Sequence, residues 1–388
     1  GGSEMCIRDS LGNFPYLATY GTNSSYNYLI NGSKPVIVKA PGLVASDFTW
    51  ETVTQMDFGF DASFLNNRLT GTFDWYRRNT KDMLVAGATL PATLGASVPK
   101  SNSADMKTIG WELSLGWNDR LENGFSYWVK GVLSDYQATI TKYAGNDAGF
   151  YSQSDGDGKY YVGQKIGEIW GYHSNGLFQS DDEAATIDQS ELYAGKWGAG
   201  DVKYEDLDGD GKITKGEETI YNPGDKSIIG NKTPRYQFGI TVGFDYKNFD
   251  FEMFWQGTGK RDYMLSGAQF WGFTSQWDVP YTPALDYWTE TNTDAYFPRP
   301  GWQNGGNRVT SDRYLQSAAY GRLKNLTVGY TIPKNLTTKW GISRLRLYVT
   351  GENLLTITPL NDAFDPETLG GLTYPINRKV AIGLNLTL

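Results

Sequence analysis

The sequence predicts an all-β fold, the C-terminal part of a large up-and-down transmembrane β-barrel with about nine long antiparallel strands. Apolar and polar residues alternate with the period of a strand in stretches of about 10 to 12 residues, which is the length that crosses a bilayer at a tilt. Aromatic residues make up 15% of the 388 residues, and the chain has 46 glycines, a composition that favours strands and turns. Short connections alternate with long ones, as in barrels with tight turns on one side of the membrane and long loops on the other.

The first four predicted strands form two hairpins. Their apolar rows carry large side chains such as Phe58 and Trp75, whereas the rows between them are polar or rich in glycine. The first hairpin turns at Asn66 and Asn67, and a loop rich in proline, glycine and serine is predicted at 79–106. The four strands are predicted at 53–64, 68–78, 107–118 and 125–142.

The remaining five predicted strands follow the same rule. The clearest is the hairpin that turns at Lys247 and Asn248, in which Phe238, Ile240 and Val242 share one row. A Greek-key sandwich would not alternate short and long connections so strictly. The five strands are predicted at 235–246, 249–259, 322–333, 343–353 and 378–388.

The strand pattern also predicts the domain organisation. Residues 11–388 form one partial barrel, in which 143–234 and 260–321 are the longest loops. We expect the barrel to be incomplete, because bacterial single-chain barrels have an even number of strands. Residues 1–10 match neither the composition nor the pattern of the rest and are predicted to be a non-native or truncation segment.

Composition excludes several classes of function. The net charge of -8 is unlike the basic surface that nucleic-acid binding needs. One histidine, His173, and one cysteine, Cys6, argue against zinc sites and catalytic triads, so the protein is predicted not to be an enzyme. The mean hydropathy is -0.47, and no apolar run approaches the roughly 18 residues of a transmembrane helix.

Several stretches resemble the C-terminal barrel portion of SusC/RagA-type TonB-dependent outer-membrane transporters, and together they cover nearly everything after Leu11. Among them are GWELSLGWNDR, DVKYEDLDGDGKIT, SIIGNKTPRYQFGITVGFDYKNFDFEMFWQGTG, YLQSAAYGRLKNLTVGYTIPKNL and RLRLYVTGENLLTIT followed by FDPE. The resemblance implies a place in the cell outer membrane and a barrel of about 22 strands around an N-terminal plug. The chain departs from the family pattern because it shows no plug and no TonB box, and because it ends in Leu388 where the family usually has an aromatic residue.

The resemblance also implies a function. Such a protein takes up oligosaccharides or peptides, with a SusD-like lipoprotein over the barrel and the TonB complex acting from the plug side. Its long loops would be extracellular. The alternative is a secreted or surface carbohydrate-binding or adhesive β-protein with a calcium loop. The apolar rows favour the transporter, because in water they would expose far more than the few hundred Å² that soluble monomers tolerate.

The stretch DLDGDGKITKGE, residues 206–217, fits the pattern of a calcium loop. Hard cations such as Ca²⁺ need several oxygen ligands that converge within one turn. The expected ligands are Asp206, Asp208, Asp210, the backbone carbonyl of Lys212, and Glu217. We expect a structural Ca²⁺ in an isolated loop, and the alternative is a solvated acidic turn.

Two further groups of residues are candidates for a role in transport. Aromatic residues of the long loops are candidates to contact cargo, although most aromatic residues in such loops pack the loops together. The substrate-binding candidates are Trp271, Trp277, Trp288 and Trp302. Charges on the polar rows are predicted to balance one another and to shape the field of the pore. They include Asp74, Arg235, Asp245 and Arg346.

Overall fold

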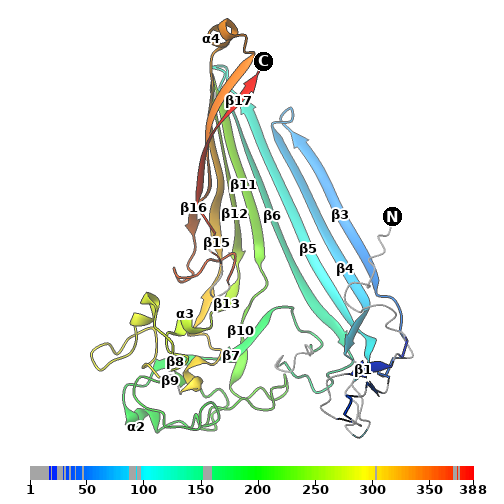
Figure 1. Ribbon diagram of the computed structural model, residues 1–388, viewed down its shortest axis with the longest axis vertical. Coiled ribbons are helices and arrows are strands. Elements are labelled where there is room, and N and C mark those ends of the chain that lie inside the picture. The colour runs from blue at the N-terminus through cyan, green and yellow to red at the C-terminus, as the bar shows by residue number, and fades with distance from the viewer. Residues whose placement is uncertain are drawn as a thin grey trace.

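The computed structural model describes residues 48–86, 98–151, 160–301, 304–369 and 376–388, together with 17–18, 20–23, 29, 32–34, 36–39, 41–45, 93 and 374. Its dominant element is an open sheet of nine antiparallel strands in the order β17-β16-β15-β12-β11-β6-β5-β4-β3. Figure 1 shows these strands side by side, with most of the loops gathered at one end. The strands are β3 (Thr52–Phe64), β4 (Leu69–Ala86), β5 (Lys100–Arg120), β6 (Ser126–Tyr143), β11 (Arg235–Tyr246), β12 (Phe249–Lys260), β15 (Tyr320–Thr331), β16 (Arg344–Ile357) and β17 (Lys379–Thr387).

All nine strands lie where the sequence predicts them, but β4 and β5 are longer than predicted. β4 continues to Ala86 and β5 begins at Lys100, so the prediction of a loop over 79–106 is wrong at both of its ends. The pairing passes an irregularity at Asp82, whose φ is 57°, and then continues. The extensions form because a small cluster of side chains covers one side of them. This cluster contains Ala104, Ile140, Tyr143, Met83, Val85, Met106, Tyr160 and Ile166.

The register of the sheet sorts its residues onto two faces, because directly paired residues on neighbouring strands point to the same side. We call the two sides the apolar face and the polar face. One paired row of the apolar face contains Phe60, Phe73, Leu113, Leu133 and Phe238. One paired row of the polar face contains Asp74, Glu112, Ser134, Gln237 and Thr258.

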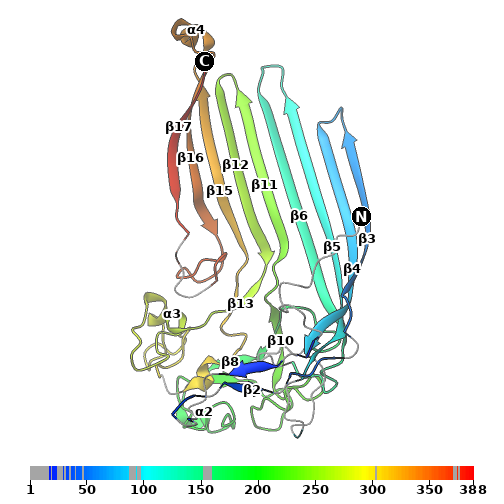
Figure 2. The ribbon, with the colours of Figure 1, turned by 45° about the vertical axis from the view of Figure 1, so that its right-hand side comes forward.

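The two ends of the sheet differ in their connections. At one end, which we call the turn end, the strands are joined by 65–68, 121–125, 247–248 and 332–343. The last of these holds α4 (Lys334–Thr337) and η4 (Thr338–Trp340). At the other end, the loop end, the connections are 87–99, 144–234, 261–319 and 358–378. Figure 2 shows the turn end above and the loop end below, with the C-terminus at the turn end.

Aromatic side chains gather on the apolar face near the turn end. Phe244 stacks on Phe251 with ring centroids 5.1 Å apart, and Phe125 lies 5.4 Å from Phe244. Phe249 and Tyr330, on the neighbouring strands β12 and β15, are 4.7 Å apart. Bands of aromatic residues of this kind mark the membrane interfaces of transmembrane barrels.

The long loops fold together into a second packed region. We call it the loop body and define it as residues 160–234, 261–319 and 358–369. Its core joins all three segments and includes Phe270, Tyr314 and Phe364. Its short elements are β7 (Glu168–Tyr172), β8 (Ser174–Leu177), α2 (Asp181–Ala184), β9 (Val202–Tyr204), β10 (Lys226–Asn231), β13 (Asp262–Met264), α3 (Ala268–Trp271), η2 (Thr282–Leu285), η3 (Gly305–Arg308) and β14 (Leu315–Ser317).

Near the N-terminus, β1 (Gly21–Asn23) pairs with β2 (Ile37–Lys39) in a small sheet of their own. The helices of the structure are short, and within the described part of the chain none has the length and apolar character to cross a membrane.

Candidate functional site

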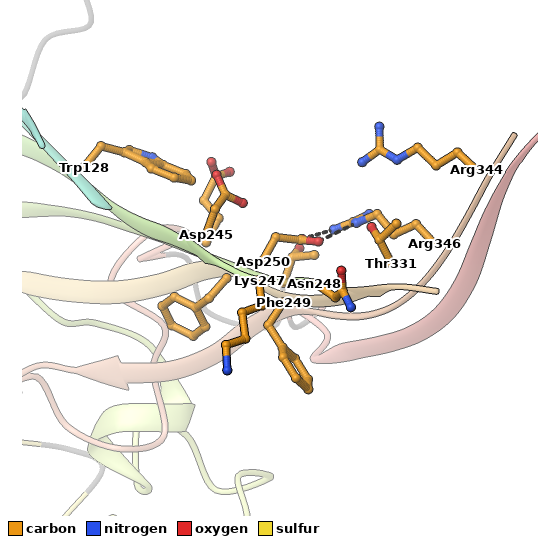
Figure 3. Close-up of a pocket in the computed structure, with 12 residues that line it drawn as sticks. Trp128, Asp245, Lys247, Asn248, Phe249, Asp250, Thr331, Arg344 and Arg346 are labelled. Atoms are coloured by element: carbon orange, nitrogen blue, oxygen red, sulfur yellow. Dashed lines mark hydrogen bonds and ion pairs between the residues drawn. The ribbon is translucent and has the colours of Figure 1, made fainter. Parts of the chain in front are cut away.

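The polar face of the sheet and the loop body beyond it form the candidate functional site. Near the turn end, the polar face is hollowed by a cavity of about 620 Å³ (Figure 3). Its lining includes Trp128, Asp245, Asp250, Glu252, Arg344 and Arg346. A concave, charged surface on one side of a sheet whose other side is apolar is what the wall of a water-filled passage requires.

Within this cavity, Arg346 and Asp250 form an ion pair that spans a whole strand. Arg346 lies on β16 and Asp250 on β12, and β15 between them presents Gly329. The Arg346 Nε donates to Asp250 Oδ1 at 2.9 Å, and Nη2 contacts the second carboxylate oxygen (Figure 3). A Cβ atom at residue 329 would collide with both partners. Glycine at this position therefore lets the two charged groups meet.

The charges of the polar rows are paired differently from the mutual balance that the sequence predicts. Arg346 neutralises Asp250, which is directly opposite Asp245 on the paired strand. Two carboxylates in directly paired positions repel each other, so this ion pair removes one of two opposed charges. Arg235 pairs with Asp135, with Nη2 2.6 Å from Oδ2. The sequence misses these partners because they lie 96 and 100 residues away in the chain.

At the loop end, Arg322 anchors the segment 358–369 to the polar face. Its side chain is only 2% exposed, and Nη2 is 2.5 Å from Asp365 Oδ2. Glu367 lies 3.0 Å from Nη1 of the same guanidinium and 3.1 Å from Lys324 Nζ. A buried charge is tolerated only when it is paired. The FDPE stretch that carries part of the family resemblance is thus the acidic partner of a buried arginine.

The four tryptophans predicted to contact cargo lie in different environments. Trp271 and Trp288 are each 8% exposed and belong to the core of the loop body. Trp271 packs edge-on against Tyr314, with centroids 4.6 Å apart. Trp277 is 84% exposed. Trp302 lies outside the described residues. Among these four, Trp277 therefore presents an accessible ring.

His173 links three segments of the loop body. Its Nδ1 is 2.8 Å from Asp312 Oδ2, and its Nε2 is 2.7 Å from Ser227 Oγ. Serine hydrolases use the same order of carboxylate, imidazole and hydroxyl. Here Asp312 also accepts the backbone N–H of Ser174 at 2.9 Å, so it holds the chain that follows His173. The contacts tie the β7–β8 junction, β10 and the segment before β14 together.

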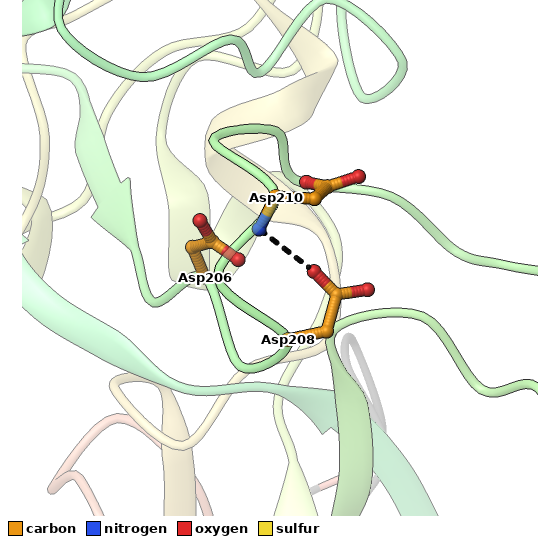
Figure 4. Close-up of side chains that lie close together, drawn as sticks. All are labelled: Asp206, Asp208 and Asp210. Carbon is orange, nitrogen blue, oxygen red and sulfur yellow. Dashed lines mark hydrogen bonds between the residues drawn. The ribbon is translucent and has the colours of Figure 1, made fainter.

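Asp206, Asp208 and Asp210 come together in the calcium-type loop (Figure 4). One carboxylate oxygen of each lies within 4.8 Å of the others. Backbone hydrogen bonds shape the loop, because the N–H of Gly211 donates to Asp206 at 2.7 Å and that of Lys212 donates to Asp210 at 2.8 Å. Three converging carboxylates in one tight turn are suitable ligands for a hard cation.

The other end of the predicted ligand set is arranged differently. Glu217 is exposed and is not a member of the group of converging carboxylates. Asp225, which the sequence does not single out, links the two sides of the loop by hydrogen bonds. It is fully buried, and its two oxygens accept the N–H groups of Leu207 and Thr214, both at 2.7 Å. One carboxylate thus holds both sides of the acidic turn.

The carboxylates of this loop repel one another. A hydrogen bond from the Asp210 N–H favours the charged form of Asp208, but burial and the charges of Asp210, Asp225 and Asp206 outweigh it and raise the pKa of Asp208. Hydrogen bonds from Gly211 and other backbone groups lower the pKa of Asp206. A bound cation would relieve the repulsion, so the donor set fits a calcium ion.

Known proteins resemble this chain in both sequence and structure. The family described as TonB dependent receptor-like, beta-barrel, matches residues 11–354. TonB-dependent receptor P3 of Formosa agariphila is 30% identical over 409 aligned residues, which cover 96% of this chain and 38% of that protein. TonB-dependent receptor SusC of Bacteroides thetaiotaomicron is 25% identical over 384 residues, covering 96% of this chain and 35% of that protein. The structure of the RagAB peptide transporter superposes with a TM-score of 0.73 and 22% identity, covering 97% of this chain and 39% of that one.

These similarities decide between the two classes of function that the sequence leaves open. The relatives are named as receptors and not as enzymes, and they do not favour a secreted carbohydrate-binding protein. The apolar face is accordingly the side that contacts lipid, and the polar face lines the lumen. The chain spans 38% of the length of the P3 receptor. The match over residues 11–354 and the nine-stranded meander show that the chain belongs to the TonB-dependent receptor-like β-barrel family of outer-membrane transporters, in its SusC/RagA type.

Proposed function

We propose that this chain forms part of the barrel wall and the loop body of a SusC-type nutrient importer. The importer takes up oligosaccharides or peptides across the outer membrane and is driven by the TonB complex, which acts through parts outside this chain. The observation that carries the proposal is the polar face, which runs along every strand of the sheet and ends at a packed loop body. In such a passage, the polar face forms the water-contacting wall and the packed loop body forms the entrance.

The loop body is the entrance and faces the outside of the cell, where a SusD-like lipoprotein covers it. The long connections support this orientation, because outer-membrane barrels have short periplasmic turns and longer extracellular loops. Residues 11–388 are one partial barrel with its loops in this arrangement.

Trp277 is the proposed cargo contact among the tryptophans of the loops. Its ring is 84% exposed, whereas Trp271 and Trp288 are held in the core. An exposed indole offers a flat apolar surface on which a sugar ring or a peptide side chain stacks. Trp271 and Trp288 then affect cargo by shaping the loops, and Trp302 stays a candidate for a cargo contact.

The acidic loop holds a structural Ca²⁺ in the complete protein. Asp206, Asp208 and Asp210 are its proposed carboxylate ligands, and the carbonyl of Lys212 and the carboxylate of Glu217 complete the set. The ion stiffens a turn of the entrance by neutralising charges that otherwise repel.

Cell fractionation of the source organism tests the proposed location and orientation. An antibody against residues 144–234 should detect the natural full-length protein in the outer membrane. Surface protease added to intact cells should abolish the signal. A signal in the soluble secreted fraction would contradict the proposal, and a signal that survives in intact cells and disappears only after lysis would contradict the orientation.

Uptake measurements test the cargo contact. Full-length Trp277→Ala should lower the uptake of labelled oligosaccharide or peptide by strain-matched cells, whereas Tyr221→Ala, a comparably exposed aromatic residue of the loop body, should not. Equal uptake by wild type and Trp277→Ala for both classes of cargo would refute a contact at Trp277.

A further inference from the structure

Basic side chains form a band on the apolar face near the loop end. The residues of β4 that point to this face run from Phe73 and Trp75 to Arg77, which is paired with Met56 and Ile109. Lys81 follows on the same strand, opposite Thr52. The side that contacts lipid thus changes within a few residues from aromatic to cationic.

The two neighbouring strands extend the band. Lys107 on β5 is paired with Asn79 on β4 and with Thr139 on β6, and Lys142 on β6 lies opposite Asp105. β4, β5 and β6 lie side by side in the sheet (Figure 1). We call Arg77, Lys81, Lys107 and Lys142 the basic band.

The four side chains of the basic band form no ion pairs with carboxylates of the described residues. Among the described residues, no carboxylate lies within 4.0 Å of the charged nitrogens of its four members. Asp105 is close in register, but its Oδ1 accepts the backbone N–H of Asp82 at 3.0 Å. Asp135 lies nearer the turn end, in the paired row of Trp75 and Trp111, and its carboxylate is paired with Arg235. The band therefore presents an excess of positive charge.

The position of the band is the second observation. Phe58 and Trp75 stack with centroids 6.1 Å apart, and Trp111 is the residue paired with Trp75 on β5. Aromatic belts of this kind lie at the depth of the lipid headgroups. The basic band begins one paired row beyond them, where lysine and arginine stems extend along apolar surface and their charges meet the headgroups. At the corresponding ends of β15 and β16, the same face presents Gly321 and Ile357 instead.

We propose that the basic band is a binding site for the phosphate groups of membrane lipids in the leaflet nearest the loop end. Phosphate oxygens match this set of donors, because arginine binds phosphate through two parallel hydrogen bonds and lysine provides point charges. The lipid lies along Phe58, Trp75 and Trp111 and places its headgroup on the band. The inference rests on the barrel lying in a membrane and is independent of cargo, lid protein and calcium.

The test uses the full-length transporter in detergent, with phosphatidic acid and phosphatidylcholine of identical acyl chains as probes. Native mass spectrometry measures how much of each lipid stays bound. Wild type should retain phosphatidic acid roughly tenfold better than phosphatidylcholine, since charge attraction at a headgroup adds up over several basic residues. The variant with Arg77→Gln, Lys81→Gln, Lys107→Gln and Lys142→Gln should lose this preference.

Two matched variants and a competitor make the result specific. A variant with Lys247→Gln, Lys334→Gln and Lys339→Gln, at the turn end, should keep the preference. A variant with Lys81→Arg, Lys107→Arg and Lys142→Arg should also keep it and shows that charge is what matters. Equal retention of the two lipids by wild type, or an unchanged preference in the glutamine variant of the band, would overturn the proposal. Binding of inorganic phosphate at the band without a preference for phosphatidic acid would also overturn it, because the site would then recognise a free anion.

Discussion

The sheet and the loop body are both rich in large apolar residues, but they expose them in opposite ways. On the sheet, Phe60 is 63% exposed and Ile382 is 83% exposed, whereas Phe270 and Tyr314 in the loop body are fully buried. The loop body hides its apolar residues from water, so burial of apolar area stabilises it. The sheet turns its apolar residues toward lipid, so its strands are held by ladder hydrogen bonds that have no competing water. The same residue types are therefore buried in the loop body and exposed on the sheet, because the loop body is surrounded by water and the sheet by lipid.

The strongest test of this comparison is at the junction of the two regions. Arg322→Met removes a buried guanidinium and leaves Asp365 and Glu367 without their partner, and breaking such a pair costs about 3 to 5 kcal/mol. We expect the segment 358–369 of the full-length protein to become sensitive to protease while the sheet stays folded. The control is Lys379→Met, which breaks an exposed pair with Glu352 at 3.6 Å and costs at most about 1 kcal/mol. Equal protease resistance of Arg322→Met and this control would show that the cluster does not anchor the segment.

A second test asks whether the two regions unfold separately. Phe270→Ala leaves a cavity in the core of the loop body and should cost about 3 to 5 kcal/mol there. Hydrogen exchange should become faster in β7, β10 and β14 and stay unchanged in β11 and β12. Faster exchange of equal size in the sheet would mean that both regions form one cooperative unit.

A third test uses neighbouring residues of β15 that point to opposite faces. Leu326→Arg places a charge toward lipid, on the residue paired with Met253 between the two aromatic bands, and should cost about 2 to 4 kcal/mol near the middle of the bilayer. Thr327→Arg places the same charge in the lumen, near Glu252 on the paired strand, and should be tolerated. Assembly is measured as the heat-sensitive gel migration of folded barrels in purified outer membranes. Loss of assembly in the Thr327 variant alone would reverse the assignment of the faces.

A fourth test concerns the acidic loop. The same substitution is expected to raise the melting temperature without calcium and to lower it with calcium. The raised pKa of Asp208 means that, without a cation, its charge opposes folding, and the stability it contributes at low pH is lost as the pH rises through the folded-state pKa. Asp208→Asn should therefore raise the melting temperature of the full-length protein in a calcium chelator at neutral pH. It should lower that temperature in millimolar Ca²⁺, because a ligand is missing.

The control for the loop is Asp294→Asn, which removes an exposed charge of the loop body away from the acidic turn. It should change neither melting temperature. If wild type melts at the same temperature with the chelator and with Ca²⁺, the acidic turn binds no calcium.

The smallest expected effect is at His173. Ser227→Ala removes one hydrogen bond to the imidazole and should cost about 0.5 to 1.5 kcal/mol. A fluorophosphonate probe for activated serines should not label Ser227 in the wild-type protein, because His173 and Asp312 act here as links between loop segments. Labelling that disappears in His173→Gln would assign a hydrolytic function instead.

The sequence predicts those ligands of the acidic loop that lie close together in the chain. Asp206, Asp208 and Asp210 converge because a single tight turn brings alternate residues together. Asp225 holds the same turn from outside the motif, and no spacing rule points to it. The lumen ion pair of Arg346 and Asp250 is missed for the same reason, since Arg346 reaches across Gly329 to a strand that begins nearly a hundred residues earlier.

The sequence alone determined the nine strands, their two faces and the rule of short and long connections. A period of two between apolar and polar residues is a local property, and it decides both that a segment is extended and which side faces lipid. Only the tertiary structure decided how far β4 and β5 extend, which tryptophans are buried and which acid meets Arg322. These outcomes depend on packing and ion pairs between distant segments, and burial of a charge or a ring depends on what the whole fold places around it.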